Sequence, residues 1–310
     1  MKHIVTGGAG FIGSHLVDRL IDAGDEVMVI DNLSTGKREF VNAKAKFIEG
    51  DIVDKDMIER VYSEYKPDYL HHLAAQIDVR YSFDHPIIDA QVNIIGTLNL
   101  IESARRYSTR RIIFASSGGT VYGEPDRNPV PESYPNIPVS PYGMSKLVSE
   151  KYLDLYKRLY GLNYVSLRLG NVFGPRQSPK GECGVFSIFA LKMLKGERPK
   201  IYGDGTATRD YIFVDDVIDS FIASLDENIP SDYYNIGRGE ETSTKEVYDL
   251  LAKVVGYSEE PIYSDPRPGE VYQISLDISK AKENLKWEPK TSLEEGVRKL
   301  IEYIKEKEFY

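Results

Sequence analysis

A glycine-rich turn lies near the start of the chain, between a short apolar run and an amphipathic stretch. Residues 2–6 are typical of a β-strand, and residues 11–23 have the apolar spacing of a helix. Gly7, Gly8 and Gly10 lie between them, and Gly13 lies in the first turn of the expected helix. Glycine permits a tight turn, and the helix that follows presents unpaired N–H groups to an anion. This order predicts a nucleotide-binding α/β fold that holds a pyrophosphate, in preference to a purely structural turn.

The same alternation of apolar runs and amphipathic stretches continues to about residue 169. Strands are expected at residues 26–30, 45–48, 69–73, 111–115 and 164–169, and helices at 54–65, 87–106 and 145–160. Strands that alternate with helices are joined by right-handed crossovers. We therefore expect a Rossmann-type, doubly wound parallel sheet.

After residue 169 this rhythm changes. Residues 171–206 are rich in Gly, Pro and Lys, with one helix expected at 185–194. A further strand and helix are expected at 210–214 and 216–225, and a last helix at 293–305. We predict a Rossmann domain of residues 1–170 plus about 207–236. The second domain would be a smaller mixed α/β lobe that binds the substrate, formed by residues of about 171–206 plus 237–310.

Composition limits the partners and the chemistry. The net charge of −9 argues against nucleic acid or an anionic membrane as a partner. Cys183 is the single cysteine, so neither an internal disulfide nor a cysteine-based zinc site can form. His71 and His72 are neighbours in an expected strand and point to opposite faces, so we expect no metal. No run of about 18 apolar residues and no signal-peptide pattern occur, and we expect a cytoplasmic protein.

An acidic residue ends the second expected strand. Asp31 follows Gly13 by 18 residues, where a carboxylate accepts hydrogen bonds from both hydroxyls of an adenosine ribose and repels a 2′-phosphate. This favours NAD over NADP, although Lys37 and Arg38 lie nearby.

Tyr142 and Lys146 stand four residues apart at the start of an expected helix, on one face. Pro141 suits a first helical turn. An ammonium beside a phenol favours the phenolate, so this pair is typical of a tyrosine general base, although Tyr-x-x-x-Lys is also a common surface pair. Hydroxyl groups at residues 116–120 follow another strand end and are well placed to bind a substrate oxygen, unless they belong to an ordinary polar turn.

These motifs together resemble the extended short-chain dehydrogenase/reductase family. The matching segments are residues 6–13, 31–34, 51–52, 72–75, 116–123, 142–146, 168–177, 203–216 and 265–277. The resemblance covers essentially the whole chain, and within the family it is greatest to the nucleoside-diphosphate-sugar 4-epimerases that act on UDP-glucose.

The resemblance implies the residues that hold NAD. They are Gly7, Gly10, Phe11, Ile12, Gly13, Asp31, Asn32, Asp51, Ile52, Leu73, Ala74, Ala75, Asn93, Tyr142 and Lys146. It also implies that Ser117 and Tyr142 act on the 4-hydroxyl of the sugar. The segment 114–121 is one residue longer than in many members, so Ser116 and Thr120 stay open as the catalytic hydroxyl.

The expected substrate is a UDP-sugar. The resemblance implies that Arg209 and Arg267 bind its diphosphate, that Asn171 contacts the substrate, and that Glu270 contacts its ribose. Tyr202 is a further candidate pocket residue, which an ordinary surface position explains equally well. From the sequence alone, a solvated surface charge is the more common role for each arginine. Ile274 is expected near the 2-substituent of the sugar, with UDP-glucose/UDP-galactose preferred and the N-acetylhexosamine pair left open.

The expected reaction is 4-epimerisation of a UDP-hexose by reversible oxidation at C4, through a 4-keto sugar. The related 4,6-dehydratases and UDP-glucuronate decarboxylases carry a carboxylate beside the catalytic hydroxyl, where this chain has Gly118, Gly119 and Thr120. Those two activities are the alternatives, and a non-catalytic NAD-binding sensor is a third. The family also implies a homodimer, paired through helices at residues 87–106 and 145–160; Ile94, Ile95 and Leu98 would supply an apolar stripe, which core packing explains equally well.

Overall fold

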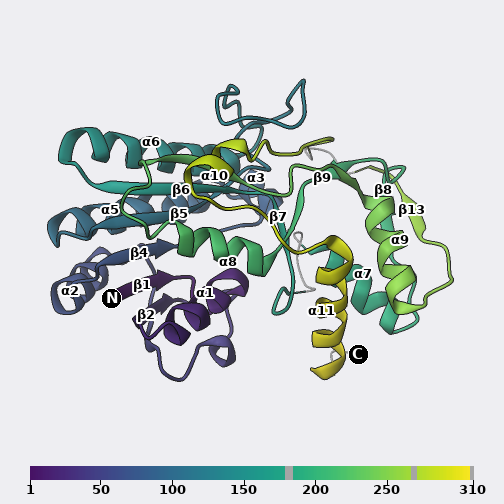
Figure 1. Ribbon diagram of the computed structural model, residues 1–310, viewed down its shortest axis with the longest axis horizontal. Coiled ribbons are helices and arrows are strands. Elements are labelled where there is room, and N and C mark those ends of the chain that lie inside the picture. The colour runs from purple at the N-terminus through teal and green to yellow at the C-terminus, as the bar shows by residue number, and fades with distance from the viewer. Residues whose placement is uncertain (179–183, 267–270, 308–310) are drawn as a thin grey trace.

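The computed structural model describes residues 1–178, 184–266 and 271–307. Seven parallel strands form the large sheet, in the order β11-β6-β5-β4-β1-β2-β3 (Figure 1). They are β1 (Lys2–Thr6), β2 (Glu26–Asp31), β3 (Lys46–Glu49), β4 (Tyr69–His72), β5 (Arg111–Ser117), β6 (Asn163–Leu169) and β11 (Asp232–Ile236). The predicted doubly wound parallel α/β fold is confirmed.

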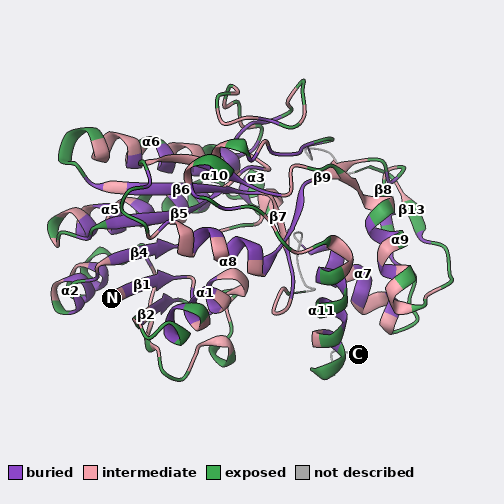
Figure 2. Ribbon diagram, in the orientation of Figure 1, coloured by how far each residue is buried: buried purple, intermediate pink, exposed green. Residues whose placement is uncertain are grey.

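Successive residues of these strands pack on opposite faces of the sheet, as strand geometry requires. Val5 and Ile113 pack on the face that α1 (Phe11–Asp22) and α8 (Val214–Ala223) cover. Ile4 and Ile112 pack on the other face, against α2 (Lys55–Tyr65), α5 (Thr97–Arg106) and α6 (Pro141–Tyr160). The strands are consequently buried on both sides, as Figure 2 shows.

A second lobe stands beside the sheet, on the right of Figure 1. Its strand pairs are β10 (Tyr211–Phe213) with β7 (Asn171–Phe173), β12 (Thr242–Ser243) with β9 (Thr208–Arg209), and β13 (Ile262–Ser264) with β8 (Lys200–Tyr202). Its helices α7 (Val185–Leu194), α9 (Thr244–Val255) and α11 (Leu293–Glu306) pack on one another, and α10 (Ser279–Asn284) lies against β11. Its apolar core is continuous with the α1 and α8 face of the sheet.

Several local expectations differ from the structure, and the edge strand β11 of the large sheet was not expected. The helix expected over residues 87–106 is divided into α4 (Pro86–Ala90), a π-helical segment (Gln91–Gly96) and α5. The helix expected at 216–225 already begins at Val214, because the strand before it ends at Phe213. Helix α9 was not expected; Ser243 and Glu246 close it with a reciprocal capping box.

The adjacent histidines do point to opposite faces of β4. His71 contacts the imidazole of His3, with 3.0 Å between nitrogen atoms, whereas His72 lies between the hydroxyls of Thr6 and Thr97. Within the described ranges, three or more potential metal ligands do not gather at any point. None of the helices in those ranges is long and apolar enough to cross a bilayer.

Candidate active site

One cavity of about 990 Å³ runs along the carboxyl ends of the central strands and into the second lobe. Ligand sites in doubly wound sheets form at this edge. The predicted residues that line it are Gly7, Gly10, Phe11, Ile12, Gly13, Asp31, Asn32, Asp51, Ile52, Leu73, Ala74, Ala75, Ser117, Tyr142, Lys146, Asn171, Tyr202 and Arg209. Arg267 and Glu270 lie outside the described residues.

The glycine turn has no room for side chains. Gly7 has a φ of +72°, a conformation that favours glycine. A β-carbon on Gly13 would lie 2.2 Å from the carbonyl oxygen of Gly7. Gly10 is the N-cap of α1 and provides no side-chain cap, so the first N–H groups of this 12-residue helix are directed to the cavity end of the turn. The turn is therefore a cradle for an anion such as a pyrophosphate.

Asp31 lies at the end of β2, beside this cradle, and is buried. Its two carboxylate oxygens accept hydrogen bonds from the backbone N–H groups of Ala9 (3.0 Å) and Leu33 (2.8 Å). Each oxygen keeps a further acceptor position. The side chain is thus fixed in the cavity wall with the capacity to accept ribose hydroxyls.

The start of α6 places Tyr142 and Lys146. Ser140 caps the helix by accepting the Gly143 N–H, and Pro141 occupies the first turn. A β-carbon on Gly143 would lie 2.7 Å from the Thr120 carbonyl oxygen, so glycine allows the helix to approach the turn after β5. Both cavity-lining side chains therefore come from one rigid turn.

Lys146 is buried, and its Nζ atom donates a 2.9 Å hydrogen bond to the carbonyl oxygen of Ala115. The same atom lies 5.8 Å from the centre of the Tyr142 ring and 4.8 Å from that of Phe114. Burial lowers the pKa of Lys146 to about 8, against the opposing charges of Asp89 and Glu150. An ammonium at this position stabilises a phenolate on Tyr142.

Three hydroxyl side chains remain candidates at the end of β5. Ser116, Ser117 and Thr120 all line the cavity. The carbonyl oxygen of Ser117 accepts the N–H groups of Thr120 (3.4 Å) and Val121 (3.2 Å), so the segment after β5 forms a tight turn. The buried hydroxyls of Ser116 and Thr120 have no hydrogen-bond partner among the described residues.

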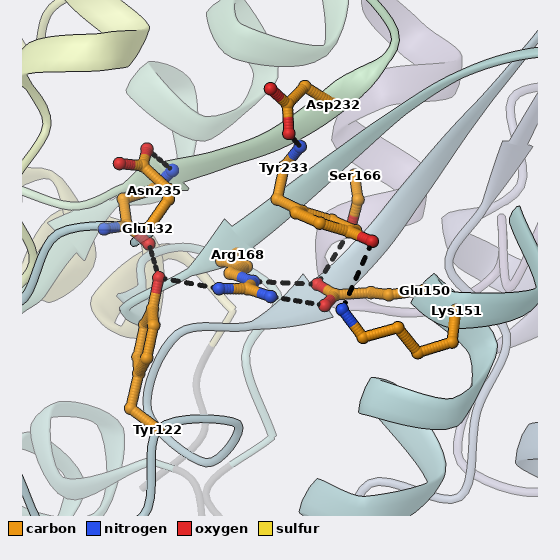
Figure 3. Close-up of polar contacts among 9 residues, drawn as sticks. All are labelled: Tyr122, Glu132, Glu150, Lys151, Ser166, Arg168, Asp232, Tyr233 and Asn235. Carbon is orange, nitrogen blue, oxygen red and sulfur yellow. Dashed lines mark hydrogen bonds and ion pairs between the residues drawn. The ribbon is translucent and has the colours of Figure 1, made fainter. Parts of the chain in front are cut away.

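A buried ion pair supports this region from behind. Arg168 of β6 and Glu150 of α6 are fully buried, with contacts of 3.0 and 2.6 Å between them (Figure 3). The guanidinium also donates to the hydroxyl of Tyr122, which donates to Asn235. Because Arg168 pairs in register with Ser116 and Glu150 follows Lys146 by one turn, the pair fixes α6 against β5 and β6.

Asn93 is the one predicted cofactor residue of the described ranges that is absent from the cavity wall. It is buried in the π-helical segment. Its amide exchanges two 2.9 Å hydrogen bonds with the backbone of Gln76, which does line the cavity. Asn93 therefore does not line the cavity itself but fixes the backbone of a residue that does.

In the second lobe, Asn171 lies opposite Gly119. A β-carbon on Gly119 would be 3.7 Å from Oδ1 of Asn171. The Nη1 atom of Arg209 donates a 2.8 Å hydrogen bond to the carbonyl oxygen of Thr208. Ile274, expected near the sugar, is instead buried in a small core with Val271 and Leu276, because its neighbours pack it beneath the wall. Val271, of the same small core, lines the cavity.

Sequence reasoning missed three cationic residues of the wall, Arg80, Lys192 and Lys200. Lys192 had a signal in the sequence, because it is the single charged residue of the otherwise apolar helix α7. No comparable signal marked Arg80 or Lys200, which lie among other charged and polar residues.

A parallel Rossmann-type sheet with a glycine cradle, an acidic residue after β2 and a Tyr-x-x-x-Lys pair defines a dinucleotide-dependent enzyme. The chain belongs to the extended short-chain dehydrogenase/reductase family. A family model described as GDP-mannose 4,6 dehydratase matches residues 4–300.

Relatives share nearly the full length. A putative UDP-glucose 4-epimerase of Methanocaldococcus jannaschii is 49% identical over 303 residues, which cover 97% of this chain and 98% of the relative. A solved UDP-glucose 4-epimerase of Thermotoga maritima, with UDP-glucose, is 47% identical, has a TM-score of 0.97 and is covered over 99% of both chains. That of Thermus thermophilus, in complex with NAD, is 42% identical with a TM-score of 0.93, over 98% of this chain and 99% of its own.

Proposed function

We propose that the protein is an NAD-dependent 4-epimerase of UDP-hexoses, with UDP-glucose and UDP-galactose as its substrates. The observation that carries this proposal is the Tyr142–Lys146 pair, which lines one cavity together with the glycine cradle. The names of the relatives at 42 to 49% identity support the same activity.

The residues present fit NAD. The glycine cradle at Gly7, Gly10 and Gly13 is closed to any β-carbon at Gly13 and would hold the pyrophosphate, and Asp31 would accept from the adenosine ribose. Asp51 and Ile52 would flank the adenine, and Leu73, Ala74 and Ala75 would line the nicotinamide side. NAD, when bound, supplies a reversible oxidation at C4 of the hexose.

Proton transfer falls to the residues of the chain. The phenolate oxygen of Tyr142 takes the proton of the 4-hydroxyl and later returns it, as a general base and acid. Lys146 stabilises the phenolate by its charge. Ser117, at the end of β5, orients the sugar oxygen, and Ser116 or Thr120 are the alternatives for this role.

The substrate would extend into the second lobe. Arg209 would bind the diphosphate, and Lys192 and Lys200 add positive charge to the same wall. Asn171 and Tyr202 would contact the sugar nucleotide. We accordingly propose the predicted division of the chain into an NAD-binding Rossmann domain and a UDP-sugar lobe. The roles of Arg267 and Glu270 and the cytoplasmic location stay predictions.

The acidic residues of the wall argue against the two alternative reactions. Among the described lining residues they are Asp31, Asp51 and Asp78. Asp31 and Asp51 belong to the cofactor end, and Asp78 caps α3 (Val79–Asp84). A 4,6-dehydratase needs a further acid and base beside the catalytic hydroxyl, where Gly118 instead packs against Leu276.

We also propose a homodimer. Helix α4, the π-helical segment and α6 expose large apolar side chains: Ile87 (73% exposed), Ile88, Ile95 and Met144. Contiguous exposed apolar residues of this size are typical of an interaction surface. Of the apolar stripe expected from the sequence, Ile95 is exposed, whereas Ile94 and Leu98 are partly buried.

Proton NMR of UDP-galactose with the protein and catalytic NAD tests the activity. Appearance of UDP-glucose without net NADH is expected, and a 4-keto-6-deoxy product would assign a dehydratase instead. Parallel incubation with UDP-N-acetylglucosamine measures the tolerance of a 2-N-acetyl group.

The role of Tyr142 is tested by substitution. Tyr142→Phe should lose about 10²- to 10⁴-fold in kcat. Tyr160→Phe is the matched control, because Tyr160 lies exposed at the far end of the same helix. Retention of more than about a tenth of the activity by Tyr142→Phe would exclude Tyr142 as the base.

A further inference from the structure

A buried polar cluster lies behind the first turn of α6. It consists of Gln76, Asp89, Asn93 and Ser145, hereafter the Asp89 cluster. The Asp89 carboxylate is 1% exposed and accepts hydrogen bonds from the amides of Asn93 (2.9 Å) and Gln76 (3.3 Å). Asn93 also donates to the hydroxyl of Ser145 at 3.2 Å. Both amide donors of Asp89 are neutral, so their hydrogen bonds leave its charge uncompensated.

The cluster connects to the active site at two points. The Ser145 hydroxyl donates to the carbonyl oxygen of Tyr142 at 2.9 Å, and the backbone of the wall residue Gln76 is bonded in both directions to Asn93. Asp89 precedes Asn93 by four residues, and Asn93 lies in the π-helical segment. Such segments often occur at functional sites, because the wider turn changes which side chains face a neighbour.

Lys146 directly follows the cluster residue Ser145 in α6, and Glu150 lies one turn further on. The buried carboxylates of Asp89 and Glu150 both raise the pKa of Lys146, against the effect of its burial. Glu150 is already bonded twice to the guanidinium of Arg168, as Figure 3 shows. Arg168 therefore cancels most of the effect that Glu150 has on other groups. Asp89 has no such compensation from its amide donors, which makes it the carboxylate with the larger net effect on Lys146.

We propose that Asp89 is a positioning residue for the proposed 4-epimerisation: it holds the Asn93 amide against the first turn of α6 and is the counter-charge that keeps Lys146 protonated. The inference rests on the proposed function of Tyr142 and Lys146. It adds a carboxylate that lies outside the cavity wall and acts through other residues.

Other titratable groups surround Asp89 and Lys146. On the elements packed against the cluster they are Tyr142 and Glu150 of α6, His72 of β4, Asp78 and Arg80 at the start of α3, and His85 before α4. Burial lowers the pKa of His72 to about 3, so His72 is neutral in the working range and adds no charge. Burial likewise raises the pKa of Asp89 above its ordinary value, opposed by its hydrogen bonds and by Lys146.

The test replaces the charge and keeps the shape. Asp89→Asn retains an oxygen acceptor for Asn93, so a change in Lys146 reports the lost charge. The carbon-13 shift of the Lys146 ε-carbon, assigned by difference from Lys146→Met, gives the protonation midpoint without any turnover. We expect this midpoint to fall by about one pH unit in Asp89→Asn. The alkaline limb of kcat/KM for UDP-galactose should move by the same amount in the same direction.

Asp84→Asn is the matched control, because Asp84 is an exposed carboxylate on the neighbouring helix α3 and should change neither measurement. If Asp89 has only a structural role, Asp89→Asn lowers the melting temperature and leaves the Lys146 midpoint in place, which overturns the inference. Should Asp89→Asn not fold, Asp89→Ser removes the same charge with a smaller side chain, and the same shift is expected. A shifted midpoint in a protein that epimerises no UDP-sugar would reject the proposed function and retain the charge relationship.

Discussion

The ammonium group of Lys146 donates its 2.9 Å hydrogen bond to the carbonyl oxygen of Ala115, two residues before Ser117. This contact joins the first turns of α6 to the carboxyl end of β5. Ala115 and Lys146 are 31 residues apart in the sequence, and the buried Arg168–Glu150 pair holds α6 in place a second time. The catalytic groups thus lie on rigid elements, as a preorganised site requires.

Replacement of Lys146 by methionine tests this arrangement directly. Methionine fills a similar buried volume without the charge, so the phenolate of Tyr142 loses its electrostatic stabilisation. We expect kcat for UDP-galactose to fall by about 10²- to 10⁴-fold, with folding retained by circular dichroism. Lys151→Met is the control, because Lys151 is exposed on the same helix and contacts Tyr233 at 3.5 Å. Equal activity of the two variants would contradict the role of Lys146.

Gly13→Ala should disrupt the cradle. Its β-carbon would lie 2.2 Å from the Gly7 carbonyl oxygen, which is backbone and cannot move away without opening the turn. The gain in helix propensity, about 1 kcal/mol, is smaller than the cost of such overpacking, about 3 kcal/mol or more. We expect a lower melting temperature and loss of NAD binding by isothermal titration calorimetry. Gly10→Ala is the graded comparison, since its nearest contact is 3.2 Å and should cost less in stability. A Gly13→Ala protein as stable as the parent would contradict the geometry.

The strand and helix order of the first half could be predicted, because each element has its own apolar period and its own turn residues. The π-helical segment could not, since its extra residue per turn follows from the packing of Asn93 against Gln76 and Ser145. Helix α9 had a local signal, the capping box of Ser243 and Glu246, that went unused.

Site residues divide in the same way. Gly7, Asp31 and Tyr142 lie within short motifs whose spacing is local, and the structure brings them into one cavity. Asp89 and Arg168 are charged residues that are completely buried, Asp89 with the amides of Gln76 and Asn93 and Arg168 with Glu150 of another element. Sequence statistics place such residues at the surface, so their burial becomes evident with the fold.

Ile95→Glu should dissociate the proposed homodimer. The side chain is 47% exposed in the single chain, and a charge there would be desolvated at an apolar interface. We expect size-exclusion chromatography with light scattering to change from a dimeric to a monomeric mass. Ile137→Glu is the matched control, because Ile137 is 65% exposed on the loop before α6 and belongs to none of the three elements of the proposed interface. An unchanged mass for Ile95→Glu would place the interface elsewhere.

Stability should fall on mild acidification because of the histidines at the amino-terminal edge of the sheet. His3 is fully buried between Tyr69 and His71, and burial lowers its pKa to about 4, with Asp25 opposing the shift and the N-terminus adding to it. The unfolded chain binds this proton near pH 6.5, whereas the folded chain resists it. The contribution of neutral His3 to the free energy of unfolding is therefore complete above about pH 6.5 and is lost as the pH falls toward 4.

Between pH 7 and pH 5 this single group should reduce the free energy of unfolding by about 2 kcal/mol, and His71, whose pKa burial also lowers, adds to the loss. Urea unfolding at the two pH values measures the difference. His3→Gln should flatten the pH dependence, because glutamine offers hydrogen-bonding groups that do not titrate. His85→Gln should leave it unchanged, because His85 is exposed. An equally steep dependence in His3→Gln would assign the acid sensitivity to other groups.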